Sequence, residues 1–417
     1  MRKIFENYGG VIAVCIAIIA FIALIGLMLV GGSGGGGWVG DSYKGLVTGL
    51  SGEVVSADIG VSASGGTNYT AEEIQANPLL YAIGATDSTY VVAEFNEDYT
   101  SVTITKNGED SDGLMMNWTS SSALMQGFSG LEAAVIKDGV KSIGISVFEN
   151  CAKLTSVTIP DGVTSIVEWA FYNCDSLTSI TIPDGVTSIG RGAFGNCANL
   201  TSVTIPDSVK SIGDSAFNGC GSLISITIPD GVTSISYAMV GKCTNLKNIT
   251  IPNSVTLIDH SAFSGCTSLE KITIPDGVKS IGNYAFKNCT SLKSITMPDS
   301  IKTIGEEAFY NCASLTSITI PDGVKSIEQR TFMNCTSLAN IIIPDNVTTI
   351  RREAFRNCTN LTSITIPDSV KTIHYYAFNC CSKLTDVYYA GTEEQWDAIS
   401  IESSNTYVTN ATIHYNA

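Results

Sequence analysis

The stretch Leu177–Asn199 has the sequence LTSITIPDGVTSIGRGAFGNCAN, and eleven copies of it follow one another with a period of 23 residues. The copies contain no insertion or deletion, and ten prolines from Pro160 to Pro367 keep the same step. One cysteine marks the same place in every copy: Cys151, Cys174, Cys197, Cys220, Cys243, Cys266, Cys289, Cys312, Cys335, Cys358 and Cys381. A strict period of about 20–50 residues predicts a stacked array in which each copy forms one turn of a solenoid.

The first half of the copy predicts a short strand followed by a turn. Leu177, Ile180 and Ile182 supply the apolar positions. Ser179 and Thr181, on either side of Ile180, suit the exposed side of a strand. Pro183 has no N–H to donate to a ladder, and the Pro-Asp-Gly sequence that it begins is typical of a turn.

The second half predicts another short extended piece and then a helical turn. Val186 and Ile189 lie three residues apart around the extended piece, whereas Ala193, Phe194 and Cys197 have a spacing close to one turn of helix. Burying each apolar side chain contributes roughly 1.5–3 kcal/mol, while ordering each residue costs about 1–2 kcal/mol of backbone entropy. These opposing terms are similar in size for one copy, so we expect the copies to fold only when stacked.

The elements LTSITIP, DGVTSIG and AF-x-N-C together resemble the BspA-like class of bacterial leucine-rich repeat, from Leu131 to Leu384. The resemblance implies a right-handed leucine-rich-repeat solenoid of short parallel β-strands with helical turns. It also implies a role at the bacterial surface, since some members are linked to adhesion, to host matrix proteins or to other cells. Met239 and Val240 replace the usual Ala-Phe, which predicts weaker packing in that copy.

The amino terminus predicts a membrane anchor. Residues 11–30 contain no charge and are long enough, at about 1.5 Å per residue, to cross a hydrocarbon core of about 30 Å. The alternative is a cleaved signal peptide, but the stretch is longer than the usual apolar region and no Ala-x-Ala site follows it. Arg2 and Lys3 precede it, which predicts a cytoplasmic tip, a single-pass protein and an extracellular location for the bulk of the chain.

Both flanks of the array predict caps that close the ends of a shared core. Residues 41–130 are acidic and lack the period; TYVVAEFNEDYTSVTITKNG predicts two strands joined by a turn, and TAEEIQANPLLYAIG one short helix that Pro78 interrupts or ends. After the array, Thr392 with Glu393 and Glu394 predicts a helix start, and Thr412 to Tyr415 a closing strand. The predicted organisation is a cytoplasmic tip and anchor at 1–30, a Gly-rich linker at 31–40, an acidic region with the first cap at 41–130, the array at 131–387 and the second cap at 388–417.

The charge distribution excludes some partners. The chain has a formal net charge of −16, and the region from Asp41 to Lys137 holds thirteen acidic residues against three lysines. An acidic chain without a basic stripe disfavours nucleic acid as a ligand. The Asp that follows Pro in nine copies suits a turn, and the glycine-rich nonapeptide of calcium solenoids is missing, so we expect no metal.

The eleven repeated cysteines are predicted to be free, buried thiols. Stacked copies would place the cysteines close enough for disulfides. Their side chains would be parallel, however, which is an unsuitable orientation for a disulfide bond. Cysteine is also a small and readily buried apolar residue. Cys380, next to the last of the series, falls outside the repeated position and is expected to be more exposed.

We predict that ligand binding uses the segment that follows the Ile-Gly pair of each copy. Residues vary most from copy to copy there, and they include aromatic and Arg side chains, which are common contact anchors. The candidate binding residues are Trp169, Tyr172, Arg191, Tyr237, Tyr284, Tyr310, Arg351, Arg352, Tyr375 and Tyr376. The competing interpretation is that this segment is exposed to solvent and that its residues vary by neutral drift.

No catalytic residues, metal ligands or cofactors are predicted. The three histidines lie in distant copies or in the tail, so neighbouring residues cannot assemble a Ser-His-Asp or Cys-His group. The sequence therefore predicts a non-enzymatic, membrane-anchored surface protein that binds an extracellular protein or glycan, as an adhesin or interaction scaffold. The alternative is a structural envelope spacer without a specific ligand.

Overall fold

The computed structural model of the chain describes residues 71–77, 79–83, 91–107, 113–115, 128 and 130–417. The predicted anchor at 11–30 and linker at 31–40 lie outside these residues, as does Pro78. Within the described ranges, none of the helices combines the length and the apolar character needed to cross a bilayer.

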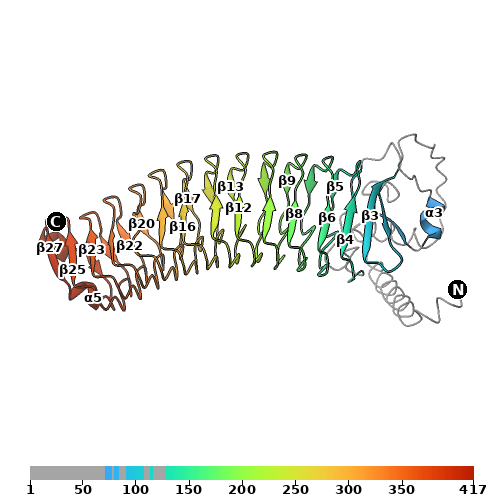
Figure 1. Cartoon of the computed structure of the whole chain (residues 1–417). Helices are drawn as coiled ribbons and strands as arrows, with labels where there is room; N and C mark the ends of the chain where they lie inside the picture. The colour runs from blue at the N-terminus through green and yellow to red at the C-terminus, as the bar shows by residue number, and fades with distance from the viewer. Residues whose placement is uncertain (1–70, 78, 84–90, 108–112, 116–127, 129) are drawn as a thin grey trace, which may run out of the picture. The chain divides into compact units, whose positions relative to one another are not determined.

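Residues 131–383 form eleven stacked coils of 23 residues, which follow one another in chain order (Figure 1). Each coil except coil 9 has one longer strand, and every coil has one two-residue strand and a turn-rich segment that leads to the next coil. Coils 1 to 11 begin at Leu131, Leu154, Leu177, Leu200, Leu223, Leu246, Leu269, Leu292, Leu315, Leu338 and Leu361. The predicted solenoid of short parallel β-strands with a 23-residue repeat is confirmed.

The longer strands pair in parallel on one side of the solenoid, and their pattern matches the alternation of the sequence. In β8 and β10 the partners are one period apart: Ile180 lies opposite Val203, flanked by exposed Ser and Thr. In coil 9 a single bridge from Thr319 to Ile342 replaces the strand. The longer strands are β4 (Ala133–Ile136), β6 (Ser156–Thr158), β8 (Ser179–Thr181), β10 (Ser202–Thr204), β12 (Ser225–Thr227), β14 (Asn248–Thr250), β16 (Lys271–Thr273), β18 (Ser294–Thr296), β21 (Asn340–Ile342), β23 (Ser363–Ile366), β25 (Asp386–Tyr389) and β27 (Thr412–Tyr415).

The two-residue strands form three separate parallel sheets of four strands each. Backbone N–H groups beside these strands donate to the preceding coil, as from Lys210, just before Ser211–Ile212, to the carbonyl of Thr187 at 2.8 Å. These strands are β5 (Ser142–Ile143), β7 (Ser165–Ile166), β9 (Ser188–Ile189), β11 (Ser211–Ile212), β13 (Ser234–Ile235), β15 (Leu257–Ile258), β17 (Ser280–Ile281), β19 (Thr303–Ile304), β20 (Ser326–Ile327), β22 (Thr349–Ile350), β24 (Thr372–Ile373) and β26 (Ser400–Ile401).

The segment after each short strand, residues 190–197 in coil 3 and its equivalents, is called the loop edge. The prediction of a helical turn there is wrong, since residues 131–391, all of them described, contain no helix. The N–H groups alternate: Ala193 donates back to Gly190, whereas Phe194 donates forward to Ala216 of the next coil at 2.8 Å. This alternation links the loop edges of neighbouring coils by backbone hydrogen bonds. In a helix, the same N–H groups would donate to carbonyls of the helix itself.

The core is continuous through the coils. Every coil except coil 5 has a buried phenylalanine at one position, and the rings of Phe286 and Phe309 stack with centroids 5.4 Å apart and planes 1° apart. The stack is interrupted in coil 5, where Met239 and Val240 are also fully buried. The expected shared interior is therefore present, and coil 5 fills its place with Met and Val instead of a ring.

The eleven repeated cysteines are buried thiols, as predicted, and Cys380 is half-buried. Each of the ten from Cys174 to Cys381 donates its S–H to a backbone carbonyl of the preceding coil, as from Cys197 Sγ to the oxygen of Phe171 at 3.1 Å. The thiol thus joins neighbouring coils in addition to filling space.

An antiparallel hairpin closes the amino-terminal end of the array. It consists of β2 (Val91–Phe95) and β3 (Ser101–Lys106), which is the strand–turn–strand unit that the sequence predicts, and β3 pairs in parallel with β4. Helix α3 (Ala71–Ala76) and strand β1 (Leu80–Ala82) precede it, and the predicted short helix is confirmed. The hairpin therefore begins the sheet that the longer strands continue.

Two helices and three strands extend the array at its carboxy-terminal end. Helix α4 (Glu393–Asp397) begins after Thr392, as predicted, and buries Trp396. A four-residue helix, α5 (Thr406–Thr409), leads to β27, which is the predicted closing strand and pairs with β25.

We expect Thr392→Ala to lower the free energy of unfolding by about 1 kcal/mol. Thr392 accepts a hydrogen bond from the N–H of Gln395, whose side chain accepts one from the N–H of Thr392, so the substitution removes half of a reciprocal cap. Equilibrium urea unfolding measures the change. Thr392→Ser keeps the hydroxyl and should match wild type; equal losses in both variants would contradict the capping role.

Candidate functional site

The loop edge has two residues with positive φ in every coil, and the two positions differ in the residues they hold. The second position holds Asn in seven coils and Gly in two, which are residue types that adopt this backbone region readily. Its Asn side chains also bond between coils, as from Asn173 Nδ2 to Asn150 Oδ1 at 2.7 Å and from Asn357 to Asn334 at 2.8 Å. Backbone geometry and stacking therefore explain the second position.

The first position with positive φ has no such preference. Among its bulky residues are Trp169 at φ 53°, Tyr284 at 61° and Tyr376 at 61°, and only coil 3 has glycine there. The full series is Ser146, Trp169, Gly192, Ser215, Ala238, Ser261, Tyr284, Glu307, Arg330, Glu353 and Tyr376. Large side chains are unusual in this region of φ and are strained there by on the order of 1 kcal/mol. Backbone preference does not account for these residues.

All ten predicted binding residues lie on the loop edge, but in separate groups along it. Trp169, Tyr172 and Arg191 belong to coils 2 and 3, and Tyr237 stands in coil 5. The other six belong to coils 7 to 11: Tyr284, Tyr310, Arg351, Arg352, Tyr375 and Tyr376. Tyr237 and Tyr375 are the most exposed of these candidate tyrosines, at 48% and 49%.

Cations bring several of these residues together. The Arg191 guanidinium lies 5.8 Å from the Trp169 ring centroid. Lys287 Nζ lies 5.1 Å from the ring of Tyr284 and 4.9 Å from that of Tyr310, and the Arg356 guanidinium lies 5.9 Å from Tyr376. Such contacts hold aromatic side chains in place on the surface while leaving part of each ring exposed.

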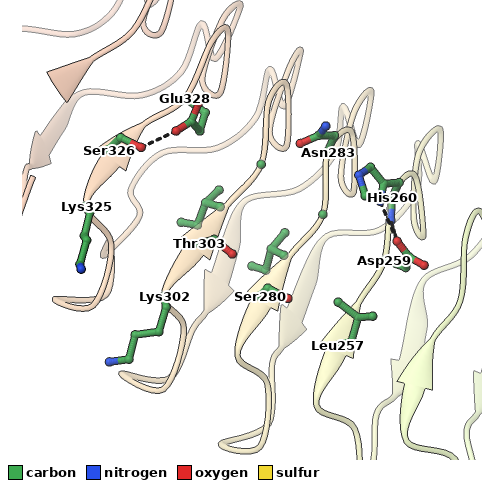
Figure 2. Close-up of a pocket in the computed structure, with 14 residues that line it drawn as sticks. Leu257, Asp259, His260, Ser280, Asn283, Lys302, Thr303, Lys325, Ser326 and Glu328 are labelled. Atoms are coloured by element: carbon green, nitrogen blue, oxygen red, sulfur yellow. Dashed lines mark hydrogen bonds and ion pairs between the residues drawn. The ribbon is translucent and has the colours of Figure 1, made fainter.

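A hollow lies beside the loop edge across coils 6 to 9, with a volume of about 420 Å³. Figure 2 shows its polar side chains in two rows, with Asp259, His260, Asn283 and Glu328 on the loop-edge side and Lys302 and Lys325 on the other. Between them lie Leu257, Ser280, Thr303 and Ser326, the first residues of β15, β17, β19 and β20. We call this the coil 6–9 hollow.

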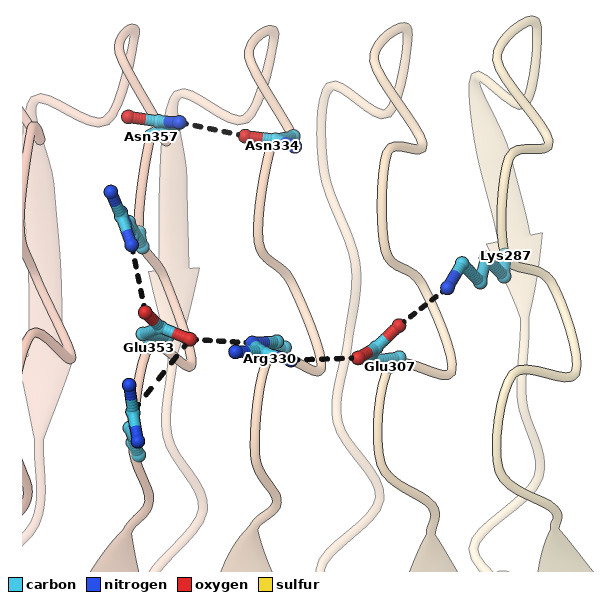
Figure 3. Close-up of polar contacts among 8 residues, drawn as sticks. Lys287, Glu307, Arg330, Asn334, Glu353 and Asn357 are labelled. Carbon is cyan, nitrogen blue, oxygen red and sulfur yellow. Dashed lines mark hydrogen bonds and ion pairs between the residues drawn. The ribbon is translucent and has the colours of Figure 1, made fainter.

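A chain of charged side chains crosses coils 7 to 10 on the loop edge (Figure 3). Lys287 Nζ contacts Glu307 at 2.7 Å, and Glu307 accepts from Arg330 at 3.3 Å. Arg330 Nε also contacts Glu353 at 2.5 Å, and Arg356 donates to the same carboxylate at 2.7 Å. A depression of about 300 Å³ lies over these groups.

Glu353 is the most enclosed member, with a side chain that is 3% exposed. Burial raises the pKa of Glu353, but hydrogen bonds from Arg330 and Arg356 lower it by more, so the net pKa lies below the ordinary value. The same contact with Glu353 raises the pKa of Arg330. The carboxylate is therefore charged at neutral pH and fixes two guanidinium groups on the loop edge.

We expect Glu353→Gln to lower the free energy of unfolding by about 1–3 kcal/mol at pH 7, because charge-assisted hydrogen bonds are lost. The folded pKa is lower than the unfolded one, so this stabilisation is full above the unfolded pKa and disappears as pH falls through the folded pKa. Urea unfolding of both proteins across pH 2–7 should show curves that converge in acid. Glu270→Gln, which alters an exposed pair with Lys293, is the control and should change little. A constant difference at every pH would contradict this role.

Sequence reasoning missed the charged chain, although the repeat contained a signal for it. Glu307, Arg330 and Glu353 occupy one position in three consecutive copies and alternate in sign. Four of the six arginines also fall between Arg330 and Arg356. Comparing the charges of residues 23 apart in the sequence would have identified this row of charged side chains.

The remaining titratable groups are dispersed. His260 contacts Asp259 at 2.7 Å, His374 contacts Glu402 at 3.2 Å and His414 contacts Asp386 at 2.8 Å. In the part of the chain that the structure describes, no three His, Cys, Asp or Glu side chains converge in a way that could hold a metal ion.

The family model of the BspA type leucine rich repeat region matches residues 121–245, 256–385 and 302–413. A leucine-rich repeat protein from Bacteroides ovatus is similar in structure, with 27% identity and a TM-score of 0.54 over 78% of this chain and 98% of that one. A leucine rich cell surface protein from Faecalibacterium prausnitzii has 33% identity and a TM-score of 0.42 over 78% of this chain and 99% of that one. No curated protein sequence matches. The matched residues span more than half of the sequence, and the chain belongs to the BspA-type leucine-rich repeat family.

Proposed function

We propose that this protein is a membrane-anchored scaffold on the cell surface that binds an extracellular protein or glycan through its loop edge. Residues 11–30 are the anchor in this proposal, and the coils extend outside the cell. The family membership supports an interaction scaffold, since solenoids of stacked repeats present extended surfaces for binding. The location is tested by fractionation: full-length protein should remain with membranes after a high-salt wash, and protein lacking residues 1–30 should be released.

The observation that supports binding most strongly is the contrast between the two positions with positive φ. The second position follows backbone preference, whereas the first holds Trp169, Tyr284 and Tyr376 in a region that disfavours them. Strained side chains of this kind persist where they serve a function. Drift on a solvated rim would instead bring in Asn or Gly, as the second position illustrates.

The side-chain chemistry of coils 7 to 11 supports the same conclusion. Tyrosine and arginine are enriched at binding hot spots, because a rigid ring or a planar guanidinium buries a large area with few rotamers. Arg351 and Arg352 have side chains that are 51% and 53% exposed, and Tyr375 is 49% exposed. The charged chain anchored on Glu353 holds its arginines in place before a ligand arrives.

The test is a double substitution, Tyr284→Asn with Tyr376→Asn, in the full-length chain. Asn suits the backbone at both positions, so the free energy of unfolding should stay within about 1 kcal/mol of wild type. Capture of extracellular matrix, mucin or neighbouring cells should fall at least about tenfold. Thr181→Ala with Thr204→Ala, on exposed residues of β8 and β10, is the matched control and should bind normally.

Two results would contradict the proposal. Wild-type protein that captures none of these preparations would favour a structural spacer. Normal capture by the tyrosine variant would show that binding does not use these loop-edge rings.

A further inference from the structure

We propose that the coil 6–9 hollow is a subsite for one neutral, polyhydroxylated sugar unit of a glycan. This inference rests on the proposed function and names the ligand class for one place beside the loop edge. None of the ten candidate binding residues predicted from the sequence lines the hollow.

The hollow arises from two consecutive coils that lack a side chain at one position. Gly282 and Gly305 occupy the place that Asp259 fills in coil 6 and Glu328 fills in coil 9. Flanking side chains therefore form walls at both ends, and the two glycines leave the space between them. Gly190 and Gly213 form a similar pair in coils 3 and 4, but the residues at the flanking position are Val167 and Ser236, which carry no charge. The combination of two glycines with a carboxylate on each side is therefore specific to coils 6–9 within the array.

The polar groups around the hollow are held in position. Asp259 contacts His260 at 2.7 Å, and Asn283 Oδ1 accepts a hydrogen bond from the N–H of Glu306 at 2.9 Å. Glu328 is held by Ser326 and by Arg351, whose Nε lies 3.0 Å away. A ligand that meets fixed polar groups avoids the entropy of ordering them.

The lining favours a neutral ligand. Lys302 and Lys325 contribute two positive charges, Asp259 and Glu328 two negative charges, and these formal charges cancel. A ligand of either sign would meet repulsion as well as attraction there. A sugar hydroxyl can donate to a carboxylate and accept from an ammonium, so a ring with several hydroxyls suits both rows. Leu257, 37% exposed, offers an apolar contact for the C–H side of the ring.

An extended peptide suits the hollow less well. Peptides that add to a sheet need unpaired backbone groups along an edge strand. Here β15 pairs with β17 and β17 with β19, so three of the four strands beneath the hollow are joined to each other. A volume of about 420 Å³ is within the range of small-ligand sites.

The test fills the hollow with a side chain that the array already accepts. Ser280→Leu with Thr303→Leu repeats the residue that coil 6 has at the same position, Leu257. Ser188→Leu with Ser211→Leu makes the same change in coils 3 and 4 and is the matched control. Full-length wild-type and variant chains are applied to immobilised neutral hexose and N-acetylhexosamine oligosaccharides, uronic-acid and sulfated oligosaccharides, and peptides. Neutral oligosaccharides that are retained are then titrated in solution by calorimetry.

We expect wild type to retain neutral oligosaccharides, with an affinity that changes less than about twofold between roughly 50 and 500 mM salt. Filling the hollow should weaken this binding at least about tenfold, whereas the control should stay within about twofold. The inference is overturned if wild type retains only charged glycans or peptides, if it retains nothing, or if both leucine pairs have the same effect.

The failure of this inference can be distinguished from failure of the proposed function. Capture of matrix or cells that depends on Tyr284 and Tyr376, without retention of a neutral oligosaccharide, would remove the sugar subsite and leave loop-edge binding intact. Neutral oligosaccharide binding that is lost on filling the hollow but unaffected by Tyr284→Asn with Tyr376→Asn would support the subsite and contradict the role of the tyrosines.

Discussion

Phe309→Ala should lower the free energy of unfolding by about 3–5 kcal/mol, the usual range for a buried Phe reduced to Ala. The ring is fully buried, and its centroid lies 5.4 Å from that of Phe286 and 5.5 Å from that of Phe332, with parallel planes. The substitution removes contacts with both neighbouring coils, and a rigid backbone ladder on either side limits collapse into the cavity. Urea unfolding followed by circular dichroism measures the loss.

The control for Phe309→Ala is Ile342→Ala, which removes an apolar side chain that is 67% exposed. Its effect should stay within about 0.5 kcal/mol. A loss below about 1 kcal/mol for Phe309→Ala would show that the ring stack contributes little and would contradict a core shared between coils.

Cys266 and Cys335 should react with iodoacetamide at least about a thousandfold more slowly in the folded chain than in the unfolded chain at pH 8. Burial raises the pKa of Cys266 to about 12 and that of Cys335 to about 12, from an ordinary value of 9.0. Only the thiolate reacts, and a rise from 9.0 to about 12 reduces its fraction about a thousandfold. Their sulfurs also donate to the carbonyls of Val240 and Phe309, each at 3.2 Å.

Mass spectrometry of peptides from native and urea-unfolded protein measures these rates cysteine by cysteine. Cys380, which is half-buried, is the internal reference and should be modified first among the cysteines that the structure describes. Equal rates for Cys266 in folded and unfolded protein would contradict the buried ladder, as would disulfides between consecutive repeated cysteines.

The repeated coil could be predicted from the sequence because the period is strict and each apolar position recurs. Ile180 and Ile189 mark the two strands, and the turn at Pro183 separates them; all three features are present. The caps were also predictable, because Thr392 begins α4 with residues that favour a helix start.

The loop edge could not be predicted in the same way, because its conformation depends on neighbouring coils. The spacing of Ala193, Phe194 and Cys197 matches a helical turn, yet alternate N–H groups such as that of Phe194 bond to the next coil. Positive φ at Gly192 and Asn196 makes this alternation possible. Local periodicity contains no information about such bonds between coils.

The candidate binding residues could be located to one edge, but their grouping could not. Variation among copies marked residues such as Tyr284 and Tyr310. The cation between their rings, Lys287, has the same repeat position as Tyr310 but was not among the candidates. The coil 6–9 hollow left no signal in a search for functional side chains, because it arises where Gly282 and Gly305 have none.

The most direct test of the shared core compares one coil with the whole chain. A peptide of residues Leu269–Ser291, which is coil 7 alone, should show no cooperative thermal transition in far-ultraviolet circular dichroism, because its apolar residues lack neighbouring coils. The full chain should melt cooperatively under the same conditions. A cooperative transition in the isolated peptide would contradict the account.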